Sequence, residues 1–314
     1  MSLLVIGSVA FDAIDTPFGS TGKIVGGAAS YISLATTLLH KHVGLVAVVG
    51  EDFDFDFVDT LKQRGTDTTG LQIKAGEKSF FWHGKYHMDM NSRDTLVTEL
   101  NVLGDFDPII PEAWQQPDYV MLGNLSPQVQ LTTLERLTRK PKLVVMDTMN
   151  FWMDIALDDL KAVLKRVDVL TINDEEARQL SGEYSLVKAA RVIRAMGPQT
   201  LIIKKGEHGA LLFGSEGQTF FCPALPLEDV FDPTGAGDTF AGGFIGYLAS
   251  TGRTDFEAMK TGIVYGSALA SYCVEQFGTT KLASITPEDV DARLAQFRLL
   301  MTEKPKEGRR SSLT

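Results

Sequence analysis

Short apolar runs alternate with helix-like segments along most of this chain, and this alternation constrains the fold more than any other feature. Strands that alternate with helices form a mainly parallel sheet covered by helices on both faces. We expect buried strands at residues 3–9, 43–49, 119–122, 143–146, 169–172 and 200–203. We expect helices at residues 28–39, 57–64, 131–139, 157–166, 174–180 and 186–196. Ligands of such sheets bind at the carboxyl ends of the strands.

Two segments depart from this alternation. Residues 78–90 are aromatic and roughly alternating, which favours antiparallel strands, and residues 12–25 are similar to a loop or ribbon. We interpret both as a small β lid over the mouth of the sheet. Neither an internal repeat nor a linker divides the sequence, so we predict one α/β domain over 1–300, with the lid from about 12–25 and 77–100. Residues 301–314 are polar and basic and are predicted to be a solvated tail.

Composition excludes several classes of protein. The 314 residues carry a formal net charge of −10, with a pI near 5.0, which disfavours binding to nucleic acid or to an anionic membrane. The two cysteines, Cys222 and Cys273, are too few for a disulfide framework and form no metal motif. The start of the chain has no basic region typical of a signal peptide, and no apolar run is long enough to span a bilayer. We expect a cytoplasmic protein.

The segment from Asp232 to Phe244, Asp-Pro-Thr-Gly-Ala-Gly-Asp-Thr-Phe-Ala-Gly-Gly-Phe, carries the strongest functional signal. Gly235 and Gly237 allow the backbone amides to converge where a helix begins, and that helix end adds unpaired N–H groups and a positive dipole. These features predict an anion hole. Asp238 follows at once, as a carboxylate in the first helical turn. A base beside an anion hole is what phosphoryl transfer to an alcohol requires.

Several motifs in order resemble those of the ribokinase-like, PfkB-type carbohydrate kinases, over about residues 2–297. The Asp232–Phe244 segment is similar to the C-terminal signature of that family, and Gly26-Gly-Ala-Ala29 to its glycine pair. The remaining matches are Gly50-Glu-Asp-Phe, Gly65-Thr-Asp-Thr-Thr-Gly70, Asn173-Asp-Glu-Glu176 and Lys204-Lys-Gly-Glu-His-Gly209. The resemblance implies a three-layer α/β/α fold with a β lid.

The resemblance also implies transfer of the γ-phosphoryl group of ATP, with Mg²⁺, to a hydroxyl of a small polyol. Asp238 would be the base, and the amides of Gly235, Ala236 and Gly237 the anion hole. The implied nucleotide residues are Asn173, Glu176, Lys204, Gly206, Gly209, Thr234 and Gly278, with Mg²⁺ held by ATP and by water that Glu176 organises. The implied acceptor residues are Asp12, Gly26, Gly27 and Tyr31. A monovalent cation and a homodimer formed through the lid are left open.

The acceptor half departs from the family pattern. Tyr31 stands where an Asn commonly follows the glycine pair, Gly7-Ser8 lacks the common Asp or Asn, and Asp147-Thr-Met-Asn-Phe-Trp152 lacks the usual proline. The chemistry therefore carries over, whereas the acceptor does not. Our first hypothesis is a sugar or sugar-like acceptor. A nucleoside kinase, with the aromatic lid stacking on a base, is the alternative, and a non-catalytic sensor is the second alternative.

Simpler explanations exist for several of these residues. Asp238 alone could be a helix-end acid, and Asn173 with Glu176 could be a helix cap. His83 and His87 would share a strand face but lack a third metal ligand, so we expect lid packing or exposure. Neither Thr21-Gly-Lys23 nor the glycine pair has the spacing of a Walker or dinucleotide motif.

Overall fold

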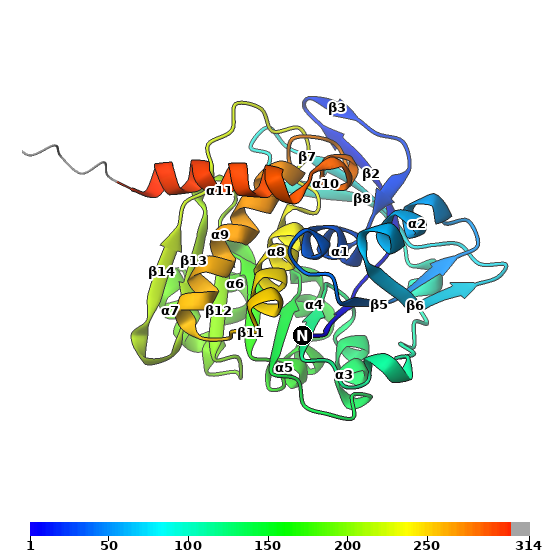
Figure 1. Cartoon of the computed structure of the whole chain (residues 1–314), viewed down its shortest axis with the longest axis horizontal. Helices are drawn as coiled ribbons and strands as arrows, with labels where there is room; N and C mark the ends of the chain where they lie inside the picture. The colour runs from blue at the N-terminus through cyan, green and yellow to red at the C-terminus, as the bar shows by residue number, and fades with distance from the viewer. Residues whose placement is uncertain (303–314) are drawn as a thin grey trace, which may run out of the picture.

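A nine-stranded sheet forms the centre of the molecule, as seen in a computed structural model that describes residues 1–302 (Figure 1). The strand order is β14-β13-β12-β11-β10-β9-β1-β5-β6. The seven strands from β12 to β6 are parallel, and β13 and β14 add an antiparallel edge. The strands are β1 (Leu3–Ile6), β5 (Val43–Gly50), β6 (Thr66–Lys74), β9 (Tyr119–Leu122), β10 (Leu143–Asp147), β11 (Val169–Asn173), β12 (Thr200–Lys204), β13 (Ala210–Phe213) and β14 (Thr219–Cys222).

Helices cover both faces of this sheet, so the predicted three-layer α/β/α fold is confirmed. Side chains from α1, α2, α8, α9 and α11 pack on one face, which includes Leu3 and Val5, and those from α3, α5, α6 and α7 on the other, which includes Leu4 and Ile6. The helices are α1 (Ala28–Leu39), α2 (Phe55–Arg64), α3 (Pro127–Glu135), α4 (Asn150–Ile155), α5 (Leu157–Leu164), α6 (Asp174–Ser181), α7 (Leu186–Arg194), α8 (Ala236–Thr251), α9 (Phe256–Cys273), α10 (Thr280–Ser284) and α11 (Pro287–Met301).

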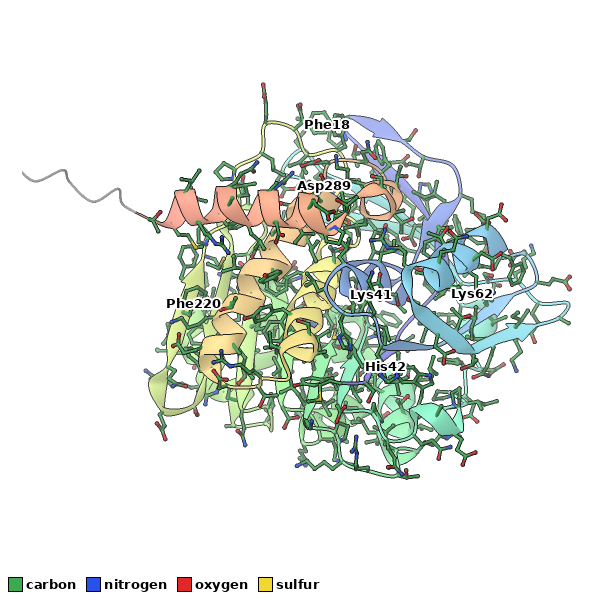
Figure 2. The ribbon with its side chains drawn as sticks, viewed as in Figure 1. Phe18, Lys41, His42, Lys62, Phe220 and Asp289 are labelled. Atoms are coloured by element: carbon green, nitrogen blue, oxygen red, sulfur yellow. The ribbon has the colours of Figure 1, made fainter. Side chains whose placement is uncertain are left out.

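The lid is a second, five-stranded sheet of order β3-β2-β7-β8, in which β4 also pairs with β2. Its strands are β2 (Ala10–Thr16), β3 (Gly19–Ser20), β4 (Ile24–Gly26), β7 (Phe81–Tyr86) and β8 (Arg93–Glu99). Figure 2 shows the exposed Phe18 at the tip of the β2–β3 ribbon. The predicted antiparallel pairing holds for β7 with β8, but β7 pairs with β2 in parallel.

Close helix contacts position the start of α8. An added Cβ at Gly243 would lie 2.9 Å from the Cα of Gly266 in α9, and one at Gly246 would lie 3.2 Å from the Cα of Thr36 in α1. These contacts explain why the helix keeps glycines that cost helical stability. None of the described helices combines the length and apolar character needed to cross a membrane. The predicted tail lies outside the described residues, apart from Met301 and Thr302.

Candidate active site

Three polar side chains stand at the carboxyl ends of neighbouring parallel strands. Asp147 ends β10, Asn173 ends β11 and Lys204 ends β12, with Asn173 and Lys204 directly paired in register. Lys204 Nζ donates to Asp147 Oδ2 at 2.9 Å, and both side chains are largely buried. The sheet therefore carries a fixed ion pair at the edge where ligands of parallel sheets bind.

The loop before α8 has the shape that its glycines predict. Gly235 is the N-cap of α8 with φ +75°, a left-handed conformation. The buried Asp232 carboxylate fixes the loop by accepting from the N–H groups of Thr234 and Gly278, each at 2.8 Å. The Ala236 N–H donates to Pro233 O at 3.2 Å. One of the three amides predicted for the anion hole thus has an internal acceptor, whereas those of Gly235 and Gly237 have none within residues 1–302.

Asp238 lies in the first turn of α8, partly exposed, beside this loop. Burial and, to a smaller extent, the nearby Asp147 carboxylate raise the pKa of its carboxyl to about 7, although Lys204 and Arg93 act in the opposite direction. An added Cβ at Gly237 would lie only 3.0 Å from Lys204 Nζ, so the ammonium group stands next to the anion loop. A carboxylate with a pKa near 7 suits a general base at neutral pH.

Asn173 and Glu176 form a capping box at the start of α6. The Glu176 N–H donates to Asn173 Oδ1 at 2.7 Å, and the Asn173 N–H donates to Glu176 Oε2 at 2.8 Å. Burial raises the pKa of Glu176 to about 7, and Lys204 partly offsets this effect. The structural role of this pair is therefore present, as expected. No cluster of three acidic, His or Cys side chains among the described residues could hold a metal ion directly.

Two of the residues predicted to bind the acceptor, Asp12 and Gly26, belong to the lid strands β2 and β4. Asp12 of β2 is buried, and its Oδ2 lies 1.8 Å from where a Cβ at Gly26 would stand, so only glycine fits there. Burial raises the pKa of Asp12 to about 7, although the Gly27 N–H, which donates to it, lowers the pKa in part.

Tyr31 is almost fully buried under the anion loop. Its ring lies 2.4 Å from where a Cβ at Gly235 would stand, and its hydroxyl has no hydrogen-bond partner among residues 1–302. Burial raises the pKa of this hydroxyl, and the carboxylate of Asp12 raises it further. Tyr31 thus connects the acceptor side of the site to the anion loop.

The lid closes over the site through its strand β7 and the turn that follows. Thr234 Oγ1 donates to the buried Tyr86 hydroxyl at 3.2 Å, which joins the lid to the anion loop. The turn reaches the loop after β12, where Asn91 Oδ1 lies 3.1 Å from the position of a Cβ on Gly206. In that loop the Lys205 N–H donates to Gly209 O at 2.8 Å.

Four contributors had no assigned role in the sequence-based prediction: Asp147, Asp232, Tyr86 and Arg93. Asp147 was noted only as a departure from the family pattern, although its place at a strand end was a usable signal. His83 and His87 do not form a pair, because His83 contacts Asp15 at 3.0 Å and His87 contacts Asp94 at 3.2 Å.

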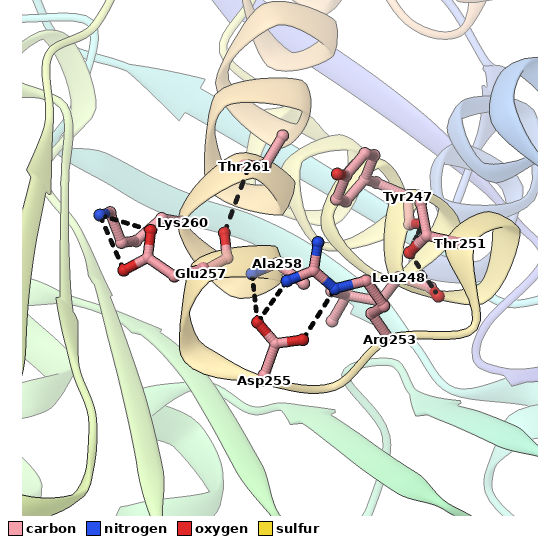
Figure 3. Close-up of polar contacts among 9 residues, drawn as sticks. All are labelled: Tyr247, Leu248, Thr251, Arg253, Asp255, Glu257, Ala258, Lys260 and Thr261. Carbon is pink, nitrogen blue, oxygen red and sulfur yellow. Dashed lines mark hydrogen bonds and ion pairs between the residues drawn. The ribbon is translucent and has the colours of Figure 1, made fainter.

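A cavity of about 400 Å³ lies at the opposite end of the parallel strands, where β10 and β12 begin, beside the turn between α8 and α9. Figure 3 shows the polar contacts of one of its lining residues, Asp255. Asp255, which lines this cavity, is already paired with Arg253 at 2.7 Å and accepts from the Ala258 N–H at 3.1 Å. The functional groups gather instead at the carboxyl edge.

Comparison with known proteins agrees with this location. The model of the pfkB family of carbohydrate kinases matches residues 2–286. A cytidine kinase of Thermococcus kodakarensis is 33% identical over 270 residues, which cover 84% of this chain and 94% of that protein. An aminoimidazole riboside kinase of Salmonella typhimurium is 26% identical, over 87% of this chain and 89% of that protein.

Two solved structures share the fold. The nucleoside kinase of Methanocaldococcus jannaschii superimposes with a TM-score of 0.75 at 20% identity, covering 94% of this chain and 99% of that one. A ribokinase II from E. coli, described as putative and in complex with ATP and Mg²⁺, gives a TM-score of 0.76 at 18% identity with the same coverage.

Proposed function

The chain belongs to the PfkB family of carbohydrate kinases and is a kinase for an alcohol group of a small sugar or nucleoside, and we propose that Asp238 is the general base of this reaction. The observation that supports this role is the position of Asp238 beside the anion loop, with a pKa raised to about 7. The helix dipole by itself would lower the pKa of an acid at this position.

In the proposed reaction the acceptor hydroxyl lies between Asp238 and the γ-phosphate of ATP. The proton of the hydroxyl passes to Asp238 while the acceptor oxygen bonds to phosphorus and the bond to ADP breaks. The amides of Gly235 and Gly237, with the positive end of α8, stabilise the charge that develops on the phosphoryl oxygens. Lys204 adds a positive charge beside Gly237, and Asp147 holds its ammonium group there.

The donor is Mg·ATP, as in the similar structure that contains both. The fixed loop with free amides fits a phosphate, and bound Mg²⁺ supplies charge neutralisation to the phosphates. Because the described residues offer no direct metal cluster, we propose that Glu176 organises water around this ion. The nucleotide would lie along Asn173, Glu176, Lys204, Gly206, Gly209, Thr234 and Gly278.

On the acceptor side we propose that Asp12 binds hydroxyl groups, with Gly26 leaving room for its carboxylate and the Gly27 N–H donating to it. Tyr31 supports this pocket from below, because it is buried against Gly235. The lid excludes water from the closed site, which limits hydrolysis of ATP.

Two further proposals concern assembly and ions. The edge strand β8 is exposed over its whole length, including Leu96 and Val97, which suits a homodimer formed through the lid. Sedimentation of the protein against a Leu96→Glu variant tests this. A requirement for a monovalent cation is tested by comparing turnover in potassium and tetramethylammonium salts.

A matched pair of variants tests the base. Asp238→Asn should lower turnover by a factor of about 10²–10⁴ while binding of Mg·ATP persists. Glu257→Gln removes another acid from the first turn of a helix, α9, where the Glu257 carboxylate pairs with Lys260 on the surface (Figure 3), and should leave turnover unchanged. Equal turnover in the two variants would refute the role of Asp238.

A further inference from the structure

One face of the lid sheet is directed at the active site. Asp12 is directly paired with Trp82 across the parallel strands β2 and β7, so the two side chains share a face. Tyr86, four residues beyond Trp82, lies on the same face because side chains alternate along a strand. The contact of Tyr86 with Thr234 identifies this face as the one over the anion loop.

Trp82 lies flat along this face. A Cβ at Gly84 would stand 1.9 Å from Cη2 of the indole, so the ring covers the backbone of Gly84. Thr95 of β8, which pairs with Gly84, accepts a hydrogen bond from the indole Nε1 at 3.2 Å. The guanidinium carbon of Arg93 lies 5.9 Å from the ring centroid. The indole is thus held at three points.

The ring is not fully covered by these contacts. The Trp82 side chain remains partly exposed, and it stands on the same face of the lid sheet as Asp12. Next to it, Asp12 offers a buried acceptor for hydroxyl groups. A flat apolar surface beside a hydroxyl acceptor has the two parts that a nucleoside requires, one for a planar base and one for a ribose.

We propose that Trp82 is a stacking platform for the base of the acceptor, so that the acceptor of this kinase is a nucleoside rather than a free sugar. This inference rests on the proposed function and names its substrate class. Aromatic side chains bind bases by stacking with little dependence on base identity, because every base has a π-face. Asp12 would hold the ribose hydroxyls while the base lies on Trp82.

Fluorescence tests the platform without any turnover. The chain has three tryptophans, of which Trp114 is buried under β5 and Trp152 hydrogen-bonds to Asn124. Cytidine and inosine should quench the emission of the protein in a saturable manner, and D-ribose should not. Trp82→Phe, which keeps an aromatic ring but removes the reporter, should abolish the quenching while retaining nucleoside turnover. Quenching that persists in Trp82→Phe would overturn the proposal.

Steady-state kinetics supplies the second test. Trp82→Leu should raise KM for cytidine or inosine by about tenfold to a hundredfold, as expected for the loss of one base-stacking contact, and Trp82→Phe should restore it. Gly84→Ala should act in the same direction without changing the ring itself, since the added methyl displaces the indole. Lys85→Ala, at the next position on the opposite, exposed face, is the matched control and should leave KM unchanged.

The outcomes separate this inference from the proposed function. If Trp82→Leu alters KM for nucleosides and D-ribose equally, or for neither, the base platform is wrong while the kinase assignment stands. If nucleosides quench Trp82 but Asp238→Asn retains full turnover, the base platform stands and the assignment of the base fails.

Discussion

Replacement of Gly235 by alanine should both destabilise the protein and abolish the anion hole. Gly235 has φ +75°, and an L-residue in this conformation costs about 1–2 kcal/mol. The new methyl would also stand 2.4 Å from the buried ring of Tyr31, and such overpacking costs about 1–3 kcal/mol. The free energy of unfolding should therefore fall by about 2–5 kcal/mol. Turnover should fall at least about 10²-fold, because the amides move from their positions around the phosphate.

Gly76 provides a control with the same backbone strain. Its φ is also +75°, but an added Cβ would meet no atom within 4 Å. Gly76→Ala should therefore cost only the conformational part, about 1–2 kcal/mol, and leave turnover intact. Urea unfolding of both variants measures the difference, which is the contribution of Tyr31. Equal destabilisation by the two substitutions would refute the inference that Tyr31 supports the anion loop.

Three further predictions concern charge and the lid. The value of kcat/KM should rise with pH through about 7 as Asp238 loses its proton. Asp147→Asn should move the midpoint of this rise to lower pH, because a neighbouring negative charge is removed. An unmoved midpoint in pH–rate profiles would exclude this coupling. The folded protein retains a proton on Asp12 up to about pH 7, against 3.8 for the free group, so Asp12 should make the free energy of unfolding fall as pH rises from about 4 to 7. Urea unfolding at pH 5 and 8 should show a smaller decrease in Asp12→Asn than in the wild type, and an equal decrease would contradict the assignment. Tyr86→Phe removes the hydrogen bond from Thr234, worth about 1 kcal/mol, so amide hydrogen exchange in β7 and β8 should accelerate about fivefold; unchanged exchange would show that this bond does not hold the lid.

Local sequence patterns predicted the central sheet well. The predicted ranges 119–122 and 28–39 coincide with β9 and α1. In both elements an apolar run ends abruptly in the sequence, so its bounds can be predicted locally. The helix expected at 131–139 was misplaced: α3 begins at Pro127 and ends at Glu135. Proline is favoured at the first position of a helix, and this local signal outweighs the apolar spacing that suggested a later start.

Pairing between distant strands was harder to predict. The strands β6, β13 and β14 were not expected, and β7 lies parallel to β2 rather than antiparallel. Strand direction depends on how the chain returns to the sheet, which a local alternation of side chains does not encode.

The same distinction holds for the site. Gly235 and Asp238 could be identified because a loop followed by a helix start is encoded in adjacent residues. Tyr86 could not, since its role depends on closure of the lid. Asp147 stands at a strand end, which is a usable signal, but its partner depends on the register of β10 beside β11. Ala236 shows the limit of motif reasoning, because its amide donates within the loop instead of remaining free.

Phosphorus NMR of the reaction tests the central claim most directly. With Mg·ATP and a panel of nucleosides and free sugars, the wild type should form ADP and a new phosphomonoester at the same rate with at least one acceptor. Asp238→Asn, with Mg·ATP binding verified by calorimetry, should form neither at a comparable rate. ADP without a phosphomonoester, or equal product from the variant, would contradict phosphoryl transfer to an acceptor hydroxyl activated by Asp238.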